Sequence, residues 1–373
     1  MKYLGNWSWN LLIESDKKFE IIGHSAAIGL VMSEFNKNRL LHAHLILGPC
    51  GCGKNKFSQV FAAMANCERN LSLRDKKIEI SQGDQLCCGV CNSCLKMASN
   101  SHPDFSLIAP SNGTIKIDQI RQLKSIIARK PTEGTYKVCL IDGADKMTEE
   151  AQNSLLKVLE ETLGDALIVL TAENKSKLLP TIISRCNLIT LGGSEIPLVE
   201  AWLISSCGAS LEQSKLFSRL SAGLCGLAYN FLKDENYLVM RRKIIEKINA
   251  LISQRDSVLA INTSENFGEM VKDLKDEEGS IENYQIDSQE AIIDLVAGYF
   301  SDILSYKTTN SIENIQNIDF ADEVVKMSDC ISLDECRKAV QEALHTAYAI
   351  RCRANPRLAI DAFMLSLCVR HAG

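Results

Sequence analysis

Residues 45–54 read LILGPCGCGK, a short apolar run followed by a glycine-rich string that ends in Lys54. The run predicts a buried strand at Leu45–Leu47, and the apolar spacing after the string predicts a helix over Lys54–Ala65. Between a strand and a helix, such a string lets backbone N–H groups and a lysine hold phosphate oxygens. The positions expected to bind nucleotide phosphates are Gly48, Gly51, Gly53 and Lys54. The alternative is a glycine turn that merely joins a strand to a helix.

From this loop outward to Leu191, apolar runs alternate with amphipathic ones, as in parallel strands joined by helical crossovers. Further strands are expected at Phe105–Ile108, Lys137–Ile141, Ala166–Thr171 and Leu188–Leu191. Further helices are expected at Ile117–Ala128 and Glu149–Glu161, the second with Thr148 as N-cap and an apolar stripe of Ala151, Leu155, Leu156 and Leu159. The predicted class is α/β with a parallel sheet.

The hydrophobic pattern of the sequence changes after Gly192-Gly193, where apolar residues at helical spacing replace the short apolar runs typical of strands. A length of 373 residues suggests two or three domains, at roughly 100–200 residues each. We expect an α/β domain at 1–193, a small helical lid domain at 194–233 and a larger all-α domain at 234–373. Within the last domain, the polar stretch 262–290 is predicted to be a mobile connection.

The composition excludes several classes of protein. A formal net charge of -5 argues against a chain that binds nucleic acid through a diffuse basic surface. No run of about 20 apolar residues could cross a bilayer. The first residues show no secretory signal, and 15 cysteines without one point to a reducing cytoplasm.

A second group of polar residues is expected at the edge of the sheet, where Asp142 ends a buried strand. In a hydrolysing site this acid would serve Mg²⁺, but Asn55 stands where the motif normally supplies a Ser or Thr hydroxyl to the ion. Gly143 follows Asp142, so the carboxylate that would orient an attacking water is missing. We therefore expect binding of ATP or ADP without turnover, with Mg²⁺ in doubt. Alternatively, Asp142 is only a strand-end acid.

Cys88, Cys91 and Cys94 form two overlapping CxxC steps, a spacing that lets thiolates converge on one tetrahedral ion. Structural Zn²⁺ is the expected occupant. The candidates for a fourth ligand are Cys67, Cys87 and His102, of which we favour Cys67, although a charged insertion at 71–85 separates it from the others. The alternative is a set of unligated cytosolic thiols.

The order of these motifs carries more information than any one of them. Together with His102-Pro103-Asp104, Leu140-Ile141-Asp142 and Ser184-Arg185-Cys186, the chain resembles bacterial clamp-loader subunits of the AAA+ class from about residue 22 to 232. The resemblance implies an AAA+ domain with a zinc module at about 67–94, and a carboxyl-terminal helical collar domain that assembles into a hetero-pentameric ring. The implied partners are gamma/tau and delta subunits, and through the complex the sliding clamp and primed DNA.

The resemblance also assigns roles that spacing alone does not reveal. Ser184, Arg185 and Cys186 would present an arginine finger to ATP held by a neighbouring subunit, whereas the plain alternative for Arg185 is a surface arginine. Thr171 matches a position that senses the γ-phosphate, although a β-branched strand residue needs no such role. Gly226 stands where hydrolysing relatives carry a sensing arginine.

These features predict a largely non-hydrolytic clamp-loader subunit whose own ATPase activity is absent or very weak. The first alternative is a hydrolysing subunit of the gamma/tau kind, which Asn55, Gly143 and Gly226 disfavour. A second is a zinc-containing DNA-binding module with a vestigial loop, and a third is a phosphotransferase, for which no general base is apparent.

Overall fold

The computed structural model describes residues 19–80, 85–161, 165–234, 236–265, 289–352 and 354–368. Its contacts divide the chain into two compact units, which we call the sheet unit (1–210 and 223–227) and the helical unit (211–222 and 228–373). The three-domain division drawn from the sequence stays a prediction. Most of the polar stretch 262–290 lies outside the described residues. No helix among those described is both long and apolar enough to span a bilayer.

The sheet unit is built on five parallel strands in the order β2-β3-β4-β1-β5. The predicted strands are all present, and their bounds are β1 Ala43–Leu47, β2 Phe105–Ile108, β3 Lys137–Ile141, β4 Ala166–Ala172 and β5 Asn187–Thr190. The α/β class with a parallel sheet is therefore confirmed. Because the strands are parallel, the residues that follow β1, β3 and β4 meet at one edge of the sheet.

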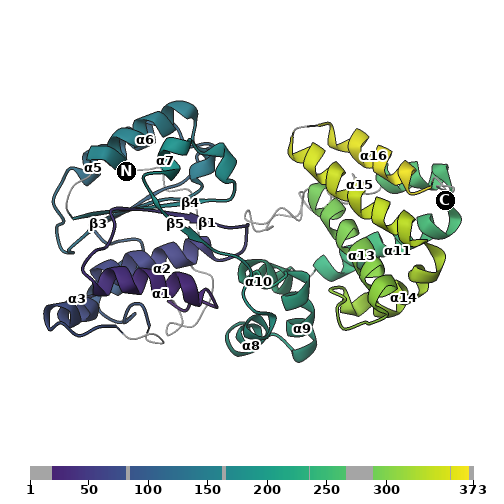
Figure 1. Cartoon of the computed structure of the whole chain (residues 1–373), viewed down its shortest axis with the longest axis horizontal. Helices are drawn as coiled ribbons and strands as arrows, with labels where there is room; N and C mark the ends of the chain where they lie inside the picture. Colours follow the sequence, from purple (N-terminus) through teal and green to yellow (C-terminus); the bar gives the residue numbers. More distant parts are fainter. Residues whose placement is uncertain are drawn as a thin grey trace. The chain divides into compact units, whose positions relative to one another are not determined.

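Helices cover both faces of the sheet, with α1, α2 and α3 on one side and α5, α6 and α7 on the other (Figure 1). Successive strand residues point to opposite faces, so the sheet has two apolar cores. Ile46 and Val138 belong to the core under α2, whereas Leu45 and Cys139 belong to the core under α6. The helix bounds are α1 Ser25–Asn36, α2 Lys54–Asn66, α3 Glu68–Asp75, α4 Asn92–Ala98, α5 Ile117–Ile127, α6 Glu149–Glu161, α7 Pro180–Ile183 and α8 Ile196–Cys207, with short 3₁₀ turns η2 Ala144–Lys146 and η3 Lys175–Lys177.

The helix at Glu149–Glu161 has the predicted bounds, and its predicted cap is present. The Thr148 hydroxyl accepts a hydrogen bond from the Ala151 N–H at 3.3 Å, which satisfies one free donor of the first turn. The predicted apolar stripe is correct except at Leu156, which is half-buried, while Val158 is buried in its place.

Ser194 joins the end of the sheet to two other segments of the same unit. Its hydroxyl donates to the Ile22 carbonyl at 2.7 Å, and its N–H donates to the Gly223 carbonyl at 2.9 Å. Gly223 has a φ of 78°, and a side chain there would overlap the Ser194 carbonyl. The segment 223–227, which we call the lid segment, is thus held against the sheet unit.

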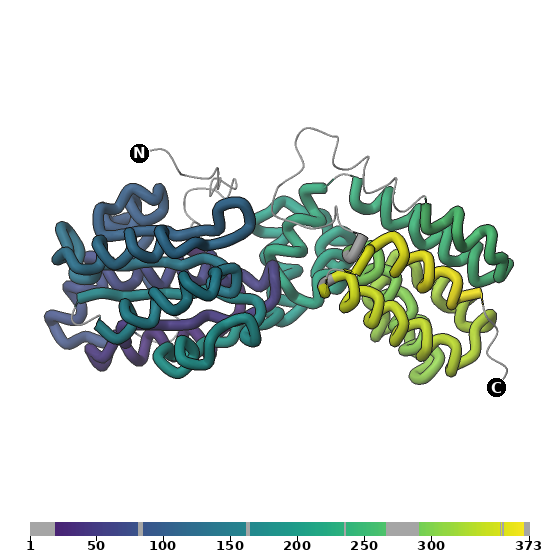
Figure 2. The backbone as a smooth tube through the Cα atoms, turned by 90° about the horizontal axis from the view of Figure 1, so that it is seen from above, coloured from purple at the N-terminus to yellow at the C-terminus, as the bar shows by residue number. Residues whose placement is uncertain are grey.

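Where the structure describes the helical unit, its regular elements are all helices, as predicted for the carboxyl-terminal part of the chain. Their bounds are α9 Leu211–Leu220, α10 Cys225–Lys233, α11 Tyr237–Gln254, α13 Gln289–Thr309, α14 Ala321–Cys330, α15 Leu333–Arg351 and α16 Pro356–Ser366, with a 3₁₀ turn η5 Ile318–Phe320. Residues 257–265 are also helical. Helix α15 lies along α16, as the yellow part of Figure 2 shows, and also packs on α13.

A buried arginine organises one end of the helical unit. The Arg241 side chain is 1% exposed, pairs with Asp319 and Asn317, and lies 4.7 Å from the centroid of the Phe320 ring. These partners compensate the cost of burying its charge. Arg219 of α9 donates to the carbonyls of Glu313 and Ile315, so α9 is tied to the same unit.

Candidate functional site

The glycine-rich string between β1 and α2 forms a tight loop around the Lys54 side chain. Gly51 and Gly53 have φ of 78° and 92°, a backbone conformation that favours glycine. The Lys54 ammonium is buried and donates to the carbonyls of Gly48 at 2.8 Å and Pro49 at 2.7 Å. It also lies 3.9 Å from a carboxylate oxygen of Glu173. The loop therefore places a fixed cation at a helix N-terminus, which is the arrangement that binds phosphates.

At the carboxyl edge of the sheet, Asp142 is held by side chains from two other elements. Its two carboxylate oxygens accept hydrogen bonds from the Asn55 amide at 2.9 Å and from the Thr171 hydroxyl at 2.7 Å. The Thr171 oxygen in turn accepts the Gly143 N–H at 3.0 Å. The structure thus brings Asn55, Asp142 and Thr171 together in one hydrogen-bond network.

The lid segment packs directly on the phosphate loop. The Gly226 N–H donates to the Gly51 carbonyl at 2.8 Å, and a Cβ at Gly226 would lie 3.0 Å from that same oxygen. The His24 ring is 2.9 Å from the Cys52 carbonyl on the loop. Position 226 therefore leaves little room for a side chain, and a Cβ there would require the Gly51 carbonyl to shift by a few tenths of an ångström.

Arg185 follows α7 and its side chain is 38% exposed. Its guanidinium donates to Glu160 at 2.6 Å and to the Thr181 carbonyl at 3.0 Å. In the described parts of the chain, no hydrogen bond or ion pair joins it to the phosphate loop. Ser184 donates to the Thr181 carbonyl at 3.0 Å. Cys186 packs against the core under α6, and burial raises the pKa of its thiol to about 12, so it is an apolar anchor for the turn.

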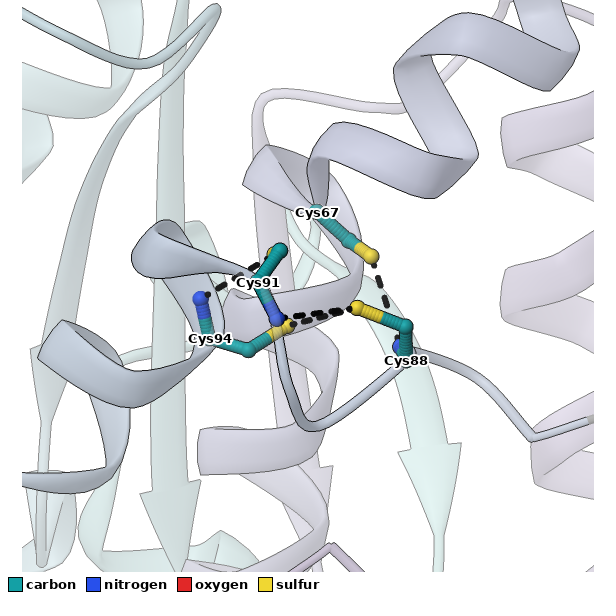
Figure 3. Close-up of side chains that lie close together, drawn as sticks. All are labelled: Cys67, Cys88, Cys91 and Cys94. Carbon is teal, nitrogen blue, oxygen red and sulfur yellow. Dashed lines mark hydrogen bonds between the residues drawn. The ribbon is translucent and has the colours of Figure 1, made fainter.

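The cysteines converge as Figure 3 shows: the sulfur atoms of Cys67, Cys88, Cys91 and Cys94 all lie within 4.8 Å of one another. Cys67 stands between α2 and α3, Cys88 and Cys91 lie in a loop, and Cys94 is on α4. Backbone N–H groups point at three of the sulfurs, at 3.3 to 3.5 Å. Such a group could hold a metal ion.

The contacts of the other candidate ligands account for their exclusion. His102 accepts the Asp104 N–H at Nδ1, so its Nε2 carries the proton and donates to Ser93 at 3.2 Å. Burial lowers the pKa of His102, which keeps this ring neutral. Cys87 is buried next to the group but is not part of it.

Cys67 lies close to the cysteines of the CxxC steps despite the insertion between them, because hydrogen bonds join the two ends of the insertion. Asn70 of α3 donates to the Leu86 carbonyl at 2.6 Å, and Arg69 donates to the Gln85 carbonyl at 2.6 Å. The first residues of the insertion, up to Asp75, belong to α3, which begins directly after Cys67. The chain therefore returns to Cys67 just before Cys88.

Three comparisons with known proteins bear on this region. Residues 23–194 match the family described as DNA polymerase III, delta subunit. The chain is 35% identical over 147 residues to DNA polymerase III subunit delta' of Pseudomonas aeruginosa, covering 39% of this chain and 41% of the relative. It is 30% identical over 226 residues to the Bacillus subtilis subunit delta', covering 61% and 64%.

Residues 23–194 are thus similar to a DNA polymerase III subunit family, and curated relatives named subunit delta' match the chain at 30% to 35% identity. The chain spans about half the length of the curated delta-prime relatives that it matches, at 41%, 52% and 64%. It is also 28% identical over 169 residues to the gamma/tau subunit of Mycobacterium tuberculosis, covering 44% of this chain and 27% of the relative. Both the phosphate loop and the cysteine group lie within residues 23–194.

The sequence did not predict the roles of several residues around these sites. Asp104 is fully buried and accepts the N–H groups of Thr132, Glu133 and Gly134 at 2.7 to 2.8 Å, and the Lys137 ammonium at 3.0 Å. Burial alone would raise the pKa of Asp104, but these donors hold it well below its usual value. Glu160 and Glu173, which meet Arg185 and Lys54, were likewise missed because they are 25 and 119 residues away in sequence.

Proposed function

We propose that this chain is a clamp-loader subunit of the delta-prime kind that does not hydrolyse ATP. The proposal is supported by the delta-prime matches and, above all, by the state of Asp142. Its carboxylate is engaged by Asn55 and Thr171, and Gly143 beside it has no side chain with which to orient a water. The metal position beside Asp142 is therefore taken by an amide, and position 143 supplies no carboxylate to orient a water.

The part that the chain would contribute to catalysis is Arg185. It is exposed, and Glu160 and the Thr181 carbonyl hold its guanidinium at the end of α7. A permanently charged guanidinium can stabilise the charge that develops on a transferring phosphoryl group. Arg185 would act in trans on ATP held by a gamma/tau subunit, in a hetero-pentameric ring that also contains delta and places a sliding clamp on primed DNA.

The cysteine group fits a structural zinc site, because four sulfurs converge from three elements in a cytosolic type of sequence. Zn²⁺ would be held by Cys67, Cys88, Cys91 and Cys94. The ion would supply four bonds that tether the loop before α4 to the end of α2. The phosphate loop would hold ATP or ADP through Lys54 and backbone N–H groups.

The test is reconstitution of the full chain with gamma/tau and delta subunits. With Arg185→Ala, ATP turnover at the one site that this residue serves is expected to fall by about a thousandfold or more. The DNA-stimulated ATPase rate of the complex should then fall by the contribution of that one site, while the ring still assembles. Arg121→Ala is a matched control, since Arg121 is an exposed arginine of the same unit that pairs with Asp118 on its own helix. Normal turnover with Arg185→Ala would refute the arginine-finger assignment.

The hydrolysing alternative has one observation in its favour, the 28% identity to a gamma/tau subunit. It requires a metal position and a water-orienting group that Asn55 and Gly143 do not supply. ATP hydrolysis by the purified chain alone, abolished by Lys54→Ala, would establish this alternative and overturn the proposal.

A further inference from the structure

In P-loop ATPases, Mg²⁺ is held between the hydroxyl that follows the loop lysine and the acid at the end of a neighbouring strand. In this chain those two positions are Asn55 and Asp142, and their side chains contact each other directly, at 2.9 Å. The space between the two groups is therefore no wider than a hydrogen bond. The residues at this position do not fit an octahedral Mg²⁺ site, which needs six oxygen ligands at about 2.1 Å.

The orientation of the Asn55 amide follows from its partner. An ionised carboxylate can only accept hydrogen bonds, so the NH₂ end of the amide must face Asp142. The second carboxylate oxygen accepts the Thr171 hydroxyl, whose own oxygen accepts the Gly143 N–H. The Asn55 amide and the Thr171 hydroxyl both donate to the carboxylate. An entering ion would have to break the bonds from both Asn55 and Thr171.

The phosphate-binding part of the loop is intact beside this network. Lys54 keeps its buried ammonium within the loop, and Gly51 and Gly53 keep the positive φ values of a tight glycine-rich loop. The loop can therefore still attract phosphate oxygens. In a hydrolysing loop, the acid at this position faces a divalent cation. In this chain, Asp142 instead faces the neutral amide of Asn55, which donates a hydrogen bond to it.

We infer that this loop takes a nucleoside di- or triphosphate without Mg²⁺, because the Asn55 amide occupies the place of the ion against Asp142. Excess Mg²⁺ would then leave nucleotide affinity unchanged, or lower it by converting free nucleotide to its magnesium complex. The inference rests on the proposed nucleotide-binding role of the loop and is independent of Arg185.

The experiment is calorimetric titration of the full, zinc-replete chain with ADP. One buffer is freed of divalent ions by chelating resin, so that no soluble chelator reaches the cysteine group, and the other contains excess Mg²⁺. The unaltered chain is expected to bind ADP in the first buffer and no more tightly in the second. With Asn55→Thr, which restores a hydroxyl ligand and frees one oxygen of Asp142, Mg²⁺ should strengthen ADP binding by about fivefold or more. Lys54→Ala should abolish binding in both buffers.

Asn55→Ser provides a second restored hydroxyl if the threonine variant folds poorly, and circular dichroism checks both. Three results would each overturn the inference: tightening of ADP binding to the unaltered chain by about fivefold or more with Mg²⁺, no saturable ADP binding in either buffer, or folded Thr and Ser variants that gain no dependence on Mg²⁺. None of these results bears on the Arg185→Ala assay, which reads ATP held by another subunit.

Discussion

The phosphate loop and the cysteine group lie in the same unit, and each brings together side chains of kinds that often bind a ligand. They differ in whether those side chains find hydrogen-bond partners within the chain. At the loop, Lys54, Asn55 and Asp142 find partners within the chain, on carbonyls and side chains. At the cysteine group, the sulfurs meet mainly one another and weak backbone donors. The polar groups at the loop are thus paired without an ion, whereas the four sulfurs of the cysteine group are arranged so that they could hold one.

The largest expected effect is at the cysteine group. Cys94→Ser removes one buried ligand, and we expect the zinc content of the purified chain to fall from about one ion per molecule to near zero, measured by atomic emission. Cys87→Ser is the matched control, because Cys87 is an equally buried neighbour outside the group. Equal zinc loss in both variants would contradict the assignment of the four ligands.

Asp104 extends the comparison to a third polar group, a carboxylate whose hydrogen-bond donors all belong to the chain itself. Asp104→Asn breaks the buried pair with Lys137 and places an amide N–H opposite backbone N–H donors. The free energy of unfolding, measured by urea titration, should therefore fall by about 3 kcal/mol. Because the folded pKa of Asp104 is lowered, its stabilisation is present above the ordinary aspartate pKa and is lost as the pH falls below it.

The variant should therefore differ most from the unaltered chain near neutral pH, with the gap narrowing in acid. A gap that stays constant down to strongly acidic pH would show that the charge of Asp104 is not what stabilises the fold.

The smallest expected effect is at the loop. Asn55→Ala removes one hydrogen bond to Asp142, which is half-buried and can be reached by water, so unfolding in urea should become easier by only about 1 kcal/mol. Zinc content should stay unchanged. Loss of several kcal/mol, or of zinc, would mean that the two sites are energetically coupled and that the comparison fails.

The sequence predicted the elements around these sites well because their signals are local. Thr148 and the helix after it were placed correctly from a capping residue and an apolar period. The edge of the sheet was predicted because parallel strands bring their ends together. Cys67 was favoured over its rivals, but only the hydrogen bonds of His102 explain why that residue is already engaged.

The contacts that decide function were not predictable, because they join residues far apart in sequence. Asn55 could be recognised as a poor magnesium ligand, yet nothing within its own segment indicates that it would donate to Asp142, 87 residues later. The same holds for the pairing of Glu160 with Arg185. Periodicity reports which face of an element is buried, but not which polar side chain meets which across the fold.

The contact between Gly226 and Gly51 bears on how such a chain can change over evolutionary time. A Cβ at Gly226 would lie 3.0 Å from the Gly51 carbonyl, and one at Gly51 would lie 2.9 Å from the Leu227 nitrogen. An arginine at position 226 would require these two backbone segments to lie further apart than they do here. A single Gly226→Arg substitution would therefore have to move the Gly51 carbonyl before its guanidinium could serve the loop, so the close backbone contact itself opposes the gain of an arginine at this position.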